Sequence, residues 1–270
     1  MSNRRILSLW FPRLGAERLI RISRGTILGP LAVVAEEANL QVLMSVSAQA
    51  SAEGLHRGMA LRDATAMCPD LTTRTQDKPS EALFLTSLRR WAGKFSPWVS
   101  EEAPDGLVID LTGCAHLFGG EEALLKQAVM DCEDLGLSVQ GGVADTVGAA
   151  WALARFTRGG TPSRNGDAID QEAYATRARA SKRRHWTKGG AAPAPKTRDL
   201  IQGKIAPPGG TRTALAPLPV TALRLSPAAI SGLARLGVRQ IGDLAELGGL
   251  GGANDGDAAW LHWPAPSGWK

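Results

Sequence analysis

Cysteine is scarce in this 270-residue sequence, and long apolar runs are missing from it. The three cysteines, Cys68, Cys114 and Cys132, are widely spaced and form no C-x-x-C pair, so neither a disulfide framework nor a zinc site is indicated. We expect them to be small buried apolar residues. No apolar run approaches the roughly 18 to 20 residues that a membrane span needs. Arg13 and Glu17 stand where a signal peptide would need an apolar core, so we expect a cytoplasmic protein with no membrane partner.

Charge is distributed unevenly along the chain. The net charge of +5 and the pI of about 9.4 suggest an anionic partner such as nucleic acid. Residues 1–150 nevertheless carry 14 basic and 18 acidic side chains, a net −4, whereas residues 151–214 carry 13 and 4, a net +9. Residues 215–270 carry four of each. The surplus positive charge therefore lies in the middle segment, which is the place to look for an anionic partner.

Apolar periodicity over residues 1–158 predicts an α+β domain. Strands are expected at 4–10, 30–36, 41–47 and 137–145 and in a hairpin at 95–113, and helices at 12–22, 47–54, 60–69, 79–94, 120–136 and 146–156. Turns are expected at Ala38-Asn39 and near Ala103-Pro104. Apart from a small helical insert near the front, the order is strand, helix, hairpin, helix, strand. This order predicts a split βαβ, ferredoxin-like sheet with helices on one face.

The periodicity breaks after residue 158 and returns near residue 215. Gly, Pro and Thr dominate between these points and predict a linker, inside which Asp170 could begin a basic helix. Further on, Ser226 is a predicted N-cap with Pro227 at the first helical position. Two short helices joined by a Gly-containing hairpin predict a helix-hairpin-helix, a unit that can offer backbone N–H groups to a phosphate. The predicted segments are a body at 1–158, a linker at 159–214, the helix-hairpin-helix at 215–248 and an irregular tail at 249–270.

Four strings, taken in order, resemble the Y-family (UmuC-like) translesion DNA polymerases. They are GLHRGMALRDATAMCPDL, FSPWVSEEAPDGLVIDLTGCAHLFG, LGLSVQGGVADTVGAAWALA and LPVTALRLSPAAISGLARLGVRQIGDLAEL. The first resembles the fingers, the second the palm hairpin, the third the palm strand and helix that follow, and the fourth the thumb. The resemblance therefore implies a palm with small helical fingers over residues 1–158 and a partial helical thumb over residues 215–248.

The acids that such a polymerase needs are replaced. Nucleotidyl transfer requires two metal ions about 3.5–4 Å apart, held by several carboxylates. The resemblance implies that these acids come from the first strand and from an Asp-Glu pair at the start of the second hairpin strand. In this sequence Trp10 replaces the first acid, and Pro12 lies near the second metal contact. Asp105 matches the Asp of the pair, but Gly106 replaces the Glu, so we interpret Asp105 as a vestige in origin and a turn residue in present function, and we expect neither a bound metal nor a catalytic residue.

The residues that grip the triphosphate are also replaced. By the same resemblance, Ala48 and Ser51 occupy the places of a Tyr and an Arg, and Val147 occupies the place of a phosphate-binding Lys. Their loss removes the charge-assisted contacts that position such an anion. Because the metal and substrate sites are lost together, the sequence favours a degenerate polymerase over an enzyme.

Two alternatives remain. The first is an active error-prone polymerase that holds Mg²⁺ after a shift of the hairpin brings Glu101, Glu102 or Asp110 inward, although strand alternation places Asp110 on the face opposite Asp105. The second is a helix-hairpin-helix DNA-binding module in which the palm serves only as a scaffold.

A polymerase fold without its acids resembles the inactive polymerase-like subunit of the bacterial inducible mutagenesis cassette, and the string DAIDQEAYATRARASKRRHWTKGG is similar to its linker. The resemblance implies a non-catalytic adaptor in the SOS response, translesion synthesis and DNA repair, with no cofactor. The partners it implies are DNA, the sliding clamp, a RecA-like accessory protein and an error-prone replicative-type polymerase.

Candidate contact residues lie in the thumb and in the linker. Arg235, Gly237 and Arg239 around the predicted hairpin are expected to contact DNA phosphates. The basic residues of the linker either contact a partner or nucleic acid or form a solvated charge run; they are Arg177, Arg179, Lys182, Arg183, Arg184 and Lys188. Trp10 is interpreted as a core residue, with stacking on a base as the alternative.

Overall fold

The palm is a four-stranded antiparallel sheet. The computed structural model describes residues 4–157 and 204–248, which belong to one compact unit. The sheet has the order β5-β6-β1-β7, and its strands are β1 (Ile6–Trp10), β5 (Val99–Glu102), β6 (Gly106–Asp110) and β7 (Gln140–Ala144). The hairpin of β5 and β6 thus pairs with one edge of β1, and β7 pairs with the other. This order confirms the predicted ferredoxin-like split βαβ arrangement.

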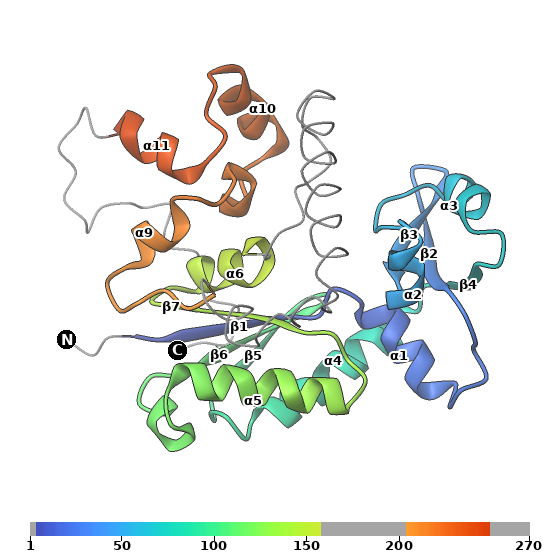
Figure 1. Cartoon of the computed structure of the whole chain (residues 1–270), viewed down its shortest axis with the longest axis horizontal. Helices are drawn as coiled ribbons and strands as arrows, with labels where there is room; N and C mark the ends of the chain where they lie inside the picture. Colours follow the sequence, from blue (N-terminus) through green and yellow to red (C-terminus); the bar gives the residue numbers. More distant parts are fainter. Residues whose placement is uncertain (1–3, 158–203, 249–270) are drawn as a thin grey trace, which may run out of the picture. The chain divides into compact units, whose positions relative to one another are not determined.

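Helices cover both faces of this sheet, so the prediction of helices on one face is wrong. α4 (Lys78–Ala92) and α5 (Glu121–Asp134) lie on one side of the strands, and α6 (Val147–Phe156) lies on the other (Figure 1). A Cβ atom on Gly141 would meet a side chain of α5, whereas a Cβ atom on the next residue, Gly142, would lie 2.5 Å from backbone atoms of α6. Strands that are buried on both faces are apolar without alternation, and β1, which is buried from Ile6 to Leu9, carried this sign of a second covered face.

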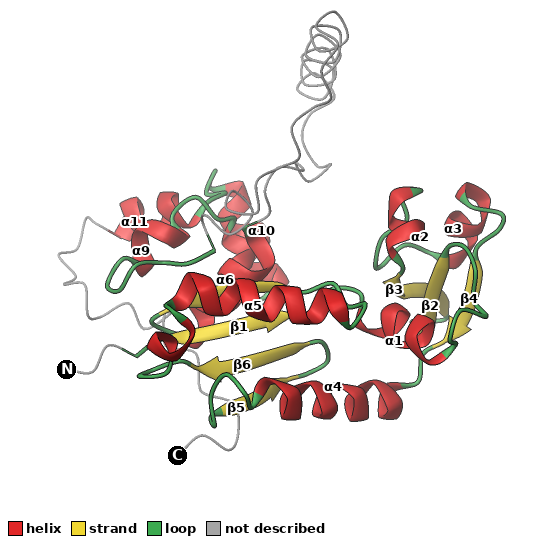
Figure 2. Cartoon of the chain, turned by 60° about the horizontal axis from the view of Figure 1, so that its bottom comes forward, coloured by secondary structure: helices red, strands yellow, loops and turns green. Residues whose placement is uncertain are grey.

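The insert between α1 (Leu14–Ile22) and α4 contains a sheet as well as helices. Figure 2 shows its three strands beside two short helices: β2 (Leu31–Glu37), β3 (Leu40–Val46), β4 (Thr72–Thr75), α2 (Ala48–Ala52) and α3 (Leu61–Met67). The strand order is β3-β2-β4, with β4 parallel to β2. The sequence did not predict β4, because three of its four residues are threonines and it contains no apolar residue. The insert is therefore an α/β fingers unit and not a purely helical one.

The predicted turn of the fingers hairpin is present between β2 and β3. Ala38 and Asn39 have φ angles of +49° and +64°. Two consecutive left-handed residues are what a two-residue hairpin turn with the native strand twist requires. The two strands pair from Glu37 and Leu40 outward, with a register shift between Val33 and Val34.

Residues 204–214, which the composition assigned to the linker, pack on the palm. The amide of Val143 donates to the carbonyl of Lys204, and the amide of Ala206 donates back to the carbonyl of Val143, each at 2.8 Å. α9 (Thr211–Leu215) follows. The glycine and proline content of this segment predicted a linker. Hydrogen bonds between its backbone and that of β7 nevertheless give it a defined structure, although its sequence has no apolar periodicity.

Arg5 holds this returning segment from inside the palm. Its side chain is only 8 % exposed and forms ion pairs with Glu121 at 2.6 Å and Asp145 at 2.7 Å. Its Nη2 atom also donates to the carbonyl of Ala206 at 2.7 Å. The other carboxylate oxygen of Asp145 accepts from the amide of Gly209 and the hydroxyl of Thr211. One buried cation thus joins β1, α5 and the chain that leads to the thumb.

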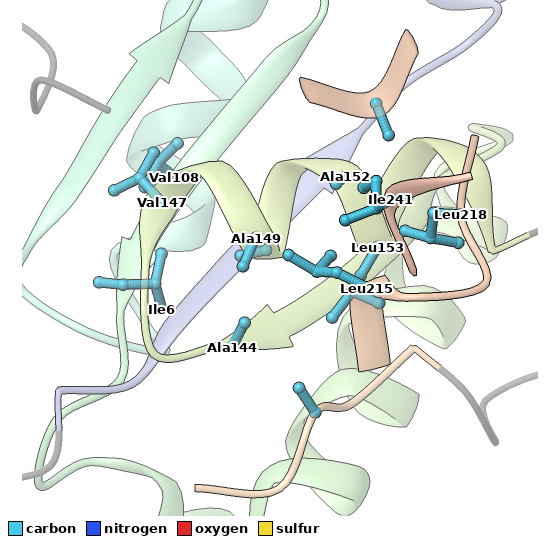
Figure 3. Packing of buried hydrophobic residues seen from close by; sticks show 13 residues of the cluster. Ile6, Val108, Ala144, Val147, Ala149, Ala152, Leu153, Leu215, Leu218 and Ile241 are labelled. Atoms are coloured by element: carbon cyan, nitrogen blue, oxygen red, sulfur yellow. The ribbon is translucent and has the colours of Figure 1, made fainter. Parts of the chain in front are cut away.

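The thumb contains the predicted pair of short helices. The short 3-10 helix η2 (Val220–Leu223) is followed by α10 (Pro227–Arg235) and α11 (Ile241–Gly248). A second 3-10 helix, η1 (Ala115–Phe118), belongs to the palm. The Ser226 hydroxyl accepts from the amide of Ala229 at 3.2 Å, which confirms the predicted cap. Buried side chains of the thumb segment join those of β1 and α6 in one cluster (Figure 3), which includes Ile6, Ala149, Leu153, Leu215, Leu218 and Ile241.

Two predicted segments fall outside the described residues: most of the linker, with its basic island, and the tail at 249–270. Among the helices that the structure does describe, none is long and apolar enough to cross a membrane.

Candidate functional site

The position to which the resemblance assigns a metal site lies where β1 ends and β6 begins. Trp10, the last residue of β1, pairs with Gly106, the first residue of β6. Asp105 directly precedes Gly106, and its carbonyl accepts from the amide of Phe11 at 2.8 Å. The Asp105 side chain is only 12 % exposed. The structure therefore brings together Trp10, Asp105 and Gly106, three of the four residues that the sequence placed at this position.

Arg155, which the sequence analysis did not single out, occupies the centre of this site. It lies in the last turn of α6, and its side chain is 11 % exposed. Nη2 lies 3.6 Å from Oδ1 of Asp105, and Nη1 lies 3.8 Å from Oε2 of Glu102. Burial lowers the pKa of Arg155, and the two carboxylates oppose this shift. The guanidinium stays charged because arginine is not deprotonated in proteins.

Two other arginines take the remaining carboxylate oxygens. Nη1 of Arg57, from the fingers, lies 3.1 Å from Oδ2 of Asp105. Nη1 of Arg224, which follows η2 in the thumb, lies 2.7 Å from Oε1 of Glu102. Each oxygen of the two carboxylates therefore faces its own guanidinium nitrogen, and three cations surround two anions.

Two tryptophans complete the cluster. The Cζ atom of Arg155 lies 5.4 Å from the ring centroid of Trp10 and 4.5 Å from that of Trp151. The Cζ atom of Arg224 lies 4.6 Å from the Trp151 centroid. These distances are within the range of cation–π attraction, which is stronger where the cation is removed from water. We call these seven residues the arginine cluster: Trp10, Arg57, Glu102, Asp105, Trp151, Arg155 and Arg224.

The expectation that Trp10 is a core residue is not met in full, and stacking on a base stays a prediction. Trp10 is half-buried rather than fully enclosed, and its ring contacts the Arg155 guanidinium. Trp10 therefore packs against Arg155 at one side of the arginine cluster. The signal that could have found the cluster is the spacing of Trp151 and Arg155, which share one helix face four residues apart.

The residues of this site do not fit two divalent cations. A Cβ atom on Gly106 would lie 3.1 Å from Nη2 of Arg155, so the guanidinium fills the space beside the position where the resemblance leads us to expect a Glu. Within residues 4–157 and 204–248, no three His, Cys, Asp or Glu side chains are grouped as metal ligands would be. The two carboxylates that are close together are already paired with arginines.

The three acids named for a rearranged metal site have separate partners. Glu101 pairs with Arg89 of α4 at 2.9 Å. Asp110 lies at the far end of β6, opposite Ile6, and pairs with Arg4 at 3.4 Å. Glu102 is the one that lies beside Asp105, and it belongs to the arginine cluster.

The space next to Asp105 is small. A hollow of about 30 Å³ is lined by Phe11, Pro12, Met44, Arg57 and Asp105 among others. A larger groove of about 400 Å³ lies next to it, along α4 and the hairpin turn. Neither is lined by the residues that the sequence placed at the triphosphate, Ala48, Ser51 and Val147. Val147 instead packs in the cluster shared by α6 and the thumb.

The thumb hairpin has its amides occupied. The amides of Arg239 and Gln240 donate to Oδ2 of Asp243 at 3.0 and 2.9 Å, and these bonds lower the pKa of Asp243. The amide of Gly237, which has a φ of +80°, donates to the carbonyl of Ala234. These N–H groups are therefore not offered to a phosphate, contrary to the expectation for the hairpin. The side chains of Arg235 and Arg239 are exposed and remain the candidate contacts.

Comparisons with known proteins agree with this architecture. Residues 21–155, half of the chain, match the impB/mucB/samB family. The chain is 36% identical over 194 residues to the protein ImuB of two strains of Caulobacter vibrioides, a match that covers 72% of this chain and 33% of each relative. The chain thus spans about a third of the length of these curated relatives.

Solved structures of DNA polymerases share the fold. The insertion ternary complex of Dbh DNA polymerase is similar with a TM-score of 0.61 and 15% identity, over 90% of this chain and 60% of that one. DinB from Sulfolobus solfataricus is similar with a TM-score of 0.59 and 14% identity over the same shares. At this level of identity the likeness concerns the fold alone.

Proposed function

This chain belongs to the impB/mucB/samB family of UmuC-like, Y-family proteins, and on that premise we propose that it serves error-prone translesion synthesis without catalysing nucleotide transfer. The observation that carries the proposal is the position of Arg155. Its guanidinium lies beside Gly106 and between the carboxylates of Asp105 and Glu102, at the place where a polymerase of this fold collects negative charge.

The charge of the site argues against phosphoryl transfer. Two divalent cations need an excess of anionic ligands, and the arginine cluster holds three guanidinium groups for two carboxylates. A metal ion brought to this place would be repelled by the buried guanidinium at short range and low dielectric. The chain therefore keeps the palm as a structural frame.

We extend the proposal to an adaptor role in DNA damage tolerance. The likeness to ImuB proteins supports it, and the partners are DNA, the sliding clamp, a RecA-like accessory protein and an error-prone replicative-type polymerase. The exposed side chains of Arg235 and Arg239 are the proposed thumb contacts with DNA. The basic linker residues from Arg177 to Lys188 are the proposed contacts with a partner or with nucleic acid.

Primer extension tests the absence of catalysis. The chain is expected to add no nucleotide to a primed template in Mg²⁺ or Mn²⁺. Incorporation that disappears in Asp105→Ala would overturn the proposal and support the active polymerase. Asp63→Ala, an exposed acid on α3, is the matched control for loss of a carboxylate.

Pull-down assays test the adaptor role. The chain is mixed with the clamp, the accessory protein and the polymerase, and the assay is repeated after deletion of residues 170–190. A second variant keeps the length but replaces the six basic linker residues by glutamine, so that loss of charge is separated from loss of chain. If the unmodified chain retains none of the three partner proteins, the adaptor role is contradicted.

DNA titrations test the thumb contacts. Arg235→Glu/Arg239→Glu is expected to weaken binding and to reduce the slope of log K against log salt by about 2, since each phosphate contact contributes about 0.9. Arg62→Glu, an exposed arginine on α3, is the matched control. If the double variant loses all DNA binding, the thumb is the whole DNA-binding unit, as the scaffold alternative states.

A further inference from the structure

The four oxygens of Asp105 and Glu102 are divided between inner and outer partners. The outer oxygens, Oδ2 and Oε1, pair with Arg57 and Arg224, whose side chains are 52 % and 35 % exposed. The inner oxygens, Oδ1 and Oε2, both face Arg155, whose side chain is 11 % exposed. Arg155 is therefore the buried cation on which both carboxylates converge.

The surroundings of Arg155 are those of a cation site. Its guanidinium faces the carboxylates of Asp105 and Glu102, and its Nη2 atom lies 3.1 Å from the Cβ position of Gly106. Both Nη1 of Arg155 and Oε2 of Glu102 are buried without a hydrogen bond of their own, so they are held by charge and not by directed bonds. Carboxylate oxygens are among the ligands that Mg²⁺ and Mn²⁺ prefer.

We infer that Arg155 is a built-in cation: its guanidinium takes the place of a divalent metal ion at the end of the palm hairpin, and a latent metal site is uncovered when that charge is removed. The sheet then needs no metal to keep Asp105 and Glu102 buried, because a covalently attached cation neutralises them. Arg155 at the same time excludes a second cation, since two positive charges would compete for the same two oxygens. This inference is independent of the adaptor role, because a chain without any partner would hold Arg155 in the same way.

Metal binding to the whole chain tests the inference, with Mn²⁺ as the probe. The unmodified chain is expected to show no saturable binding of Mn²⁺ by electron paramagnetic resonance and no change in Tm on its addition. Arg155→Met keeps the apolar stem against Trp10 and Trp151 but removes the charge. This variant is expected to bind Mn²⁺ and to gain roughly 3 °C or more in Tm at about ten times its Kd.

Three further variants assign the effect to the inner oxygens. Arg155→Lys restores a cation and is expected to bind no Mn²⁺. Arg155→Met/Asp105→Asn removes one inner ligand and is expected to lose the Mn²⁺ that Arg155→Met binds. Arg89→Met frees Glu101, the neighbour of Glu102 in β5, and is expected to bind no Mn²⁺, although it also leaves a carboxylate unpaired.

Two results would overturn the inference. One is the absence of Mn²⁺ binding both in Arg155→Met and in Arg155→Met/Arg57→Met, in which Arg57 can no longer move onto the freed oxygens. The other needs no altered arginine: saturable Mn²⁺ binding by the unmodified chain that Asp105→Asn abolishes. This second measurement decides the matter even if the Arg155 variants fail to fold.

Discussion

Nη2 of Arg155 lies 3.1 Å from the position that a Cβ atom of Gly106 would occupy. The arginine lies in the last turn of α6, and the glycine is the first residue of β6. Two residues that are far apart in the sequence therefore act at one place: Gly106, where the resemblance leads us to expect an acid, and the basic Arg155. With both present, the end of the palm hairpin is a cationic cluster.

This relationship predicts that returning the acids alone does not return activity. Trp10→Asp/Gly106→Glu supplies the two carboxylates that the sequence lacks, but Arg155 remains within reach to pair with them. We therefore expect no nucleotide incorporation by the double variant in a primer-extension assay with Mn²⁺. Retained DNA binding is the control for folding, and extension of the primer by this variant would show that Arg155 does not block the site.

Gly142 is predicted to be indispensable for the packing of α6 on β7. A Cβ atom there would lie 2.5 Å from the carbonyl of Ala150 and the amide of Ala154, which are backbone atoms that cannot turn away. Gly142→Ala should lower the free energy of unfolding by about 3 kcal/mol, measured by urea denaturation. Gly232→Ala in α10 is the matched control: nothing lies within 4 Å of its Cβ position, and it should stabilise the chain by roughly 0.5–1 kcal/mol. Equal effects at the two glycines would contradict this prediction.

Arg5 is predicted to hold the thumb segment to the palm. Arg5→Met would leave Glu121, Asp145 and the carbonyl of Ala206 without their shared cation, and the loss of one partner from a buried ion pair costs about 3–5 kcal/mol. Urea denaturation measures the loss, and faster amide exchange at residues 204–210 locates it. Arg62→Met is the control, because its ion pair with Asp63 is exposed and should contribute less than about 1 kcal/mol. Unchanged amide exchange at residues 204–210 would show that the backbone hydrogen bonds to β7 are enough to hold this segment to the palm.

Glu17 is predicted to make stability fall as pH rises. Burial raises its pKa above the usual 4.5, although the hydroxyl and amide of Ser138 donate to the carboxylate and oppose the shift. The folded chain then binds the proton more tightly than the unfolded chain. The free energy of unfolding therefore decreases between pH 4.5 and the raised pKa of the folded state.

Urea denaturation at about pH 4 and about pH 7 measures this effect. Glu17→Gln should lose less stability than the unmodified chain between the two pH values, because the amide does not titrate. Glu37→Gln, at the end of β2, is the matched substitution at an exposed position. A pH dependence in Glu17→Gln that equals that of the unmodified chain would show that Glu17 does not cause the fall.

The local elements of this protein followed from its sequence. The Ala38-Asn39 turn, the Ser226-Pro227 helix start and the apolar strand ending at Trp10 depend on residues that are neighbours in the chain, and local pattern was enough to predict them. β4 was missed because its threonines form a strand only once β2 lies beside them, and the contact is parallel and therefore distant in sequence.

From the sequence, the family resemblance also implied that Trp10 and Gly106 stand where a polymerase palm has acids. It did not determine what replaced them. Only the tertiary structure decided that Arg155 and Arg224 meet the carboxylate of Glu102, across a separation that reaches 122 residues for Arg224. Periodicity and composition report the neighbours of a residue along the chain, whereas the charge of a buried site depends on which side chains folding brings within a few ångströms.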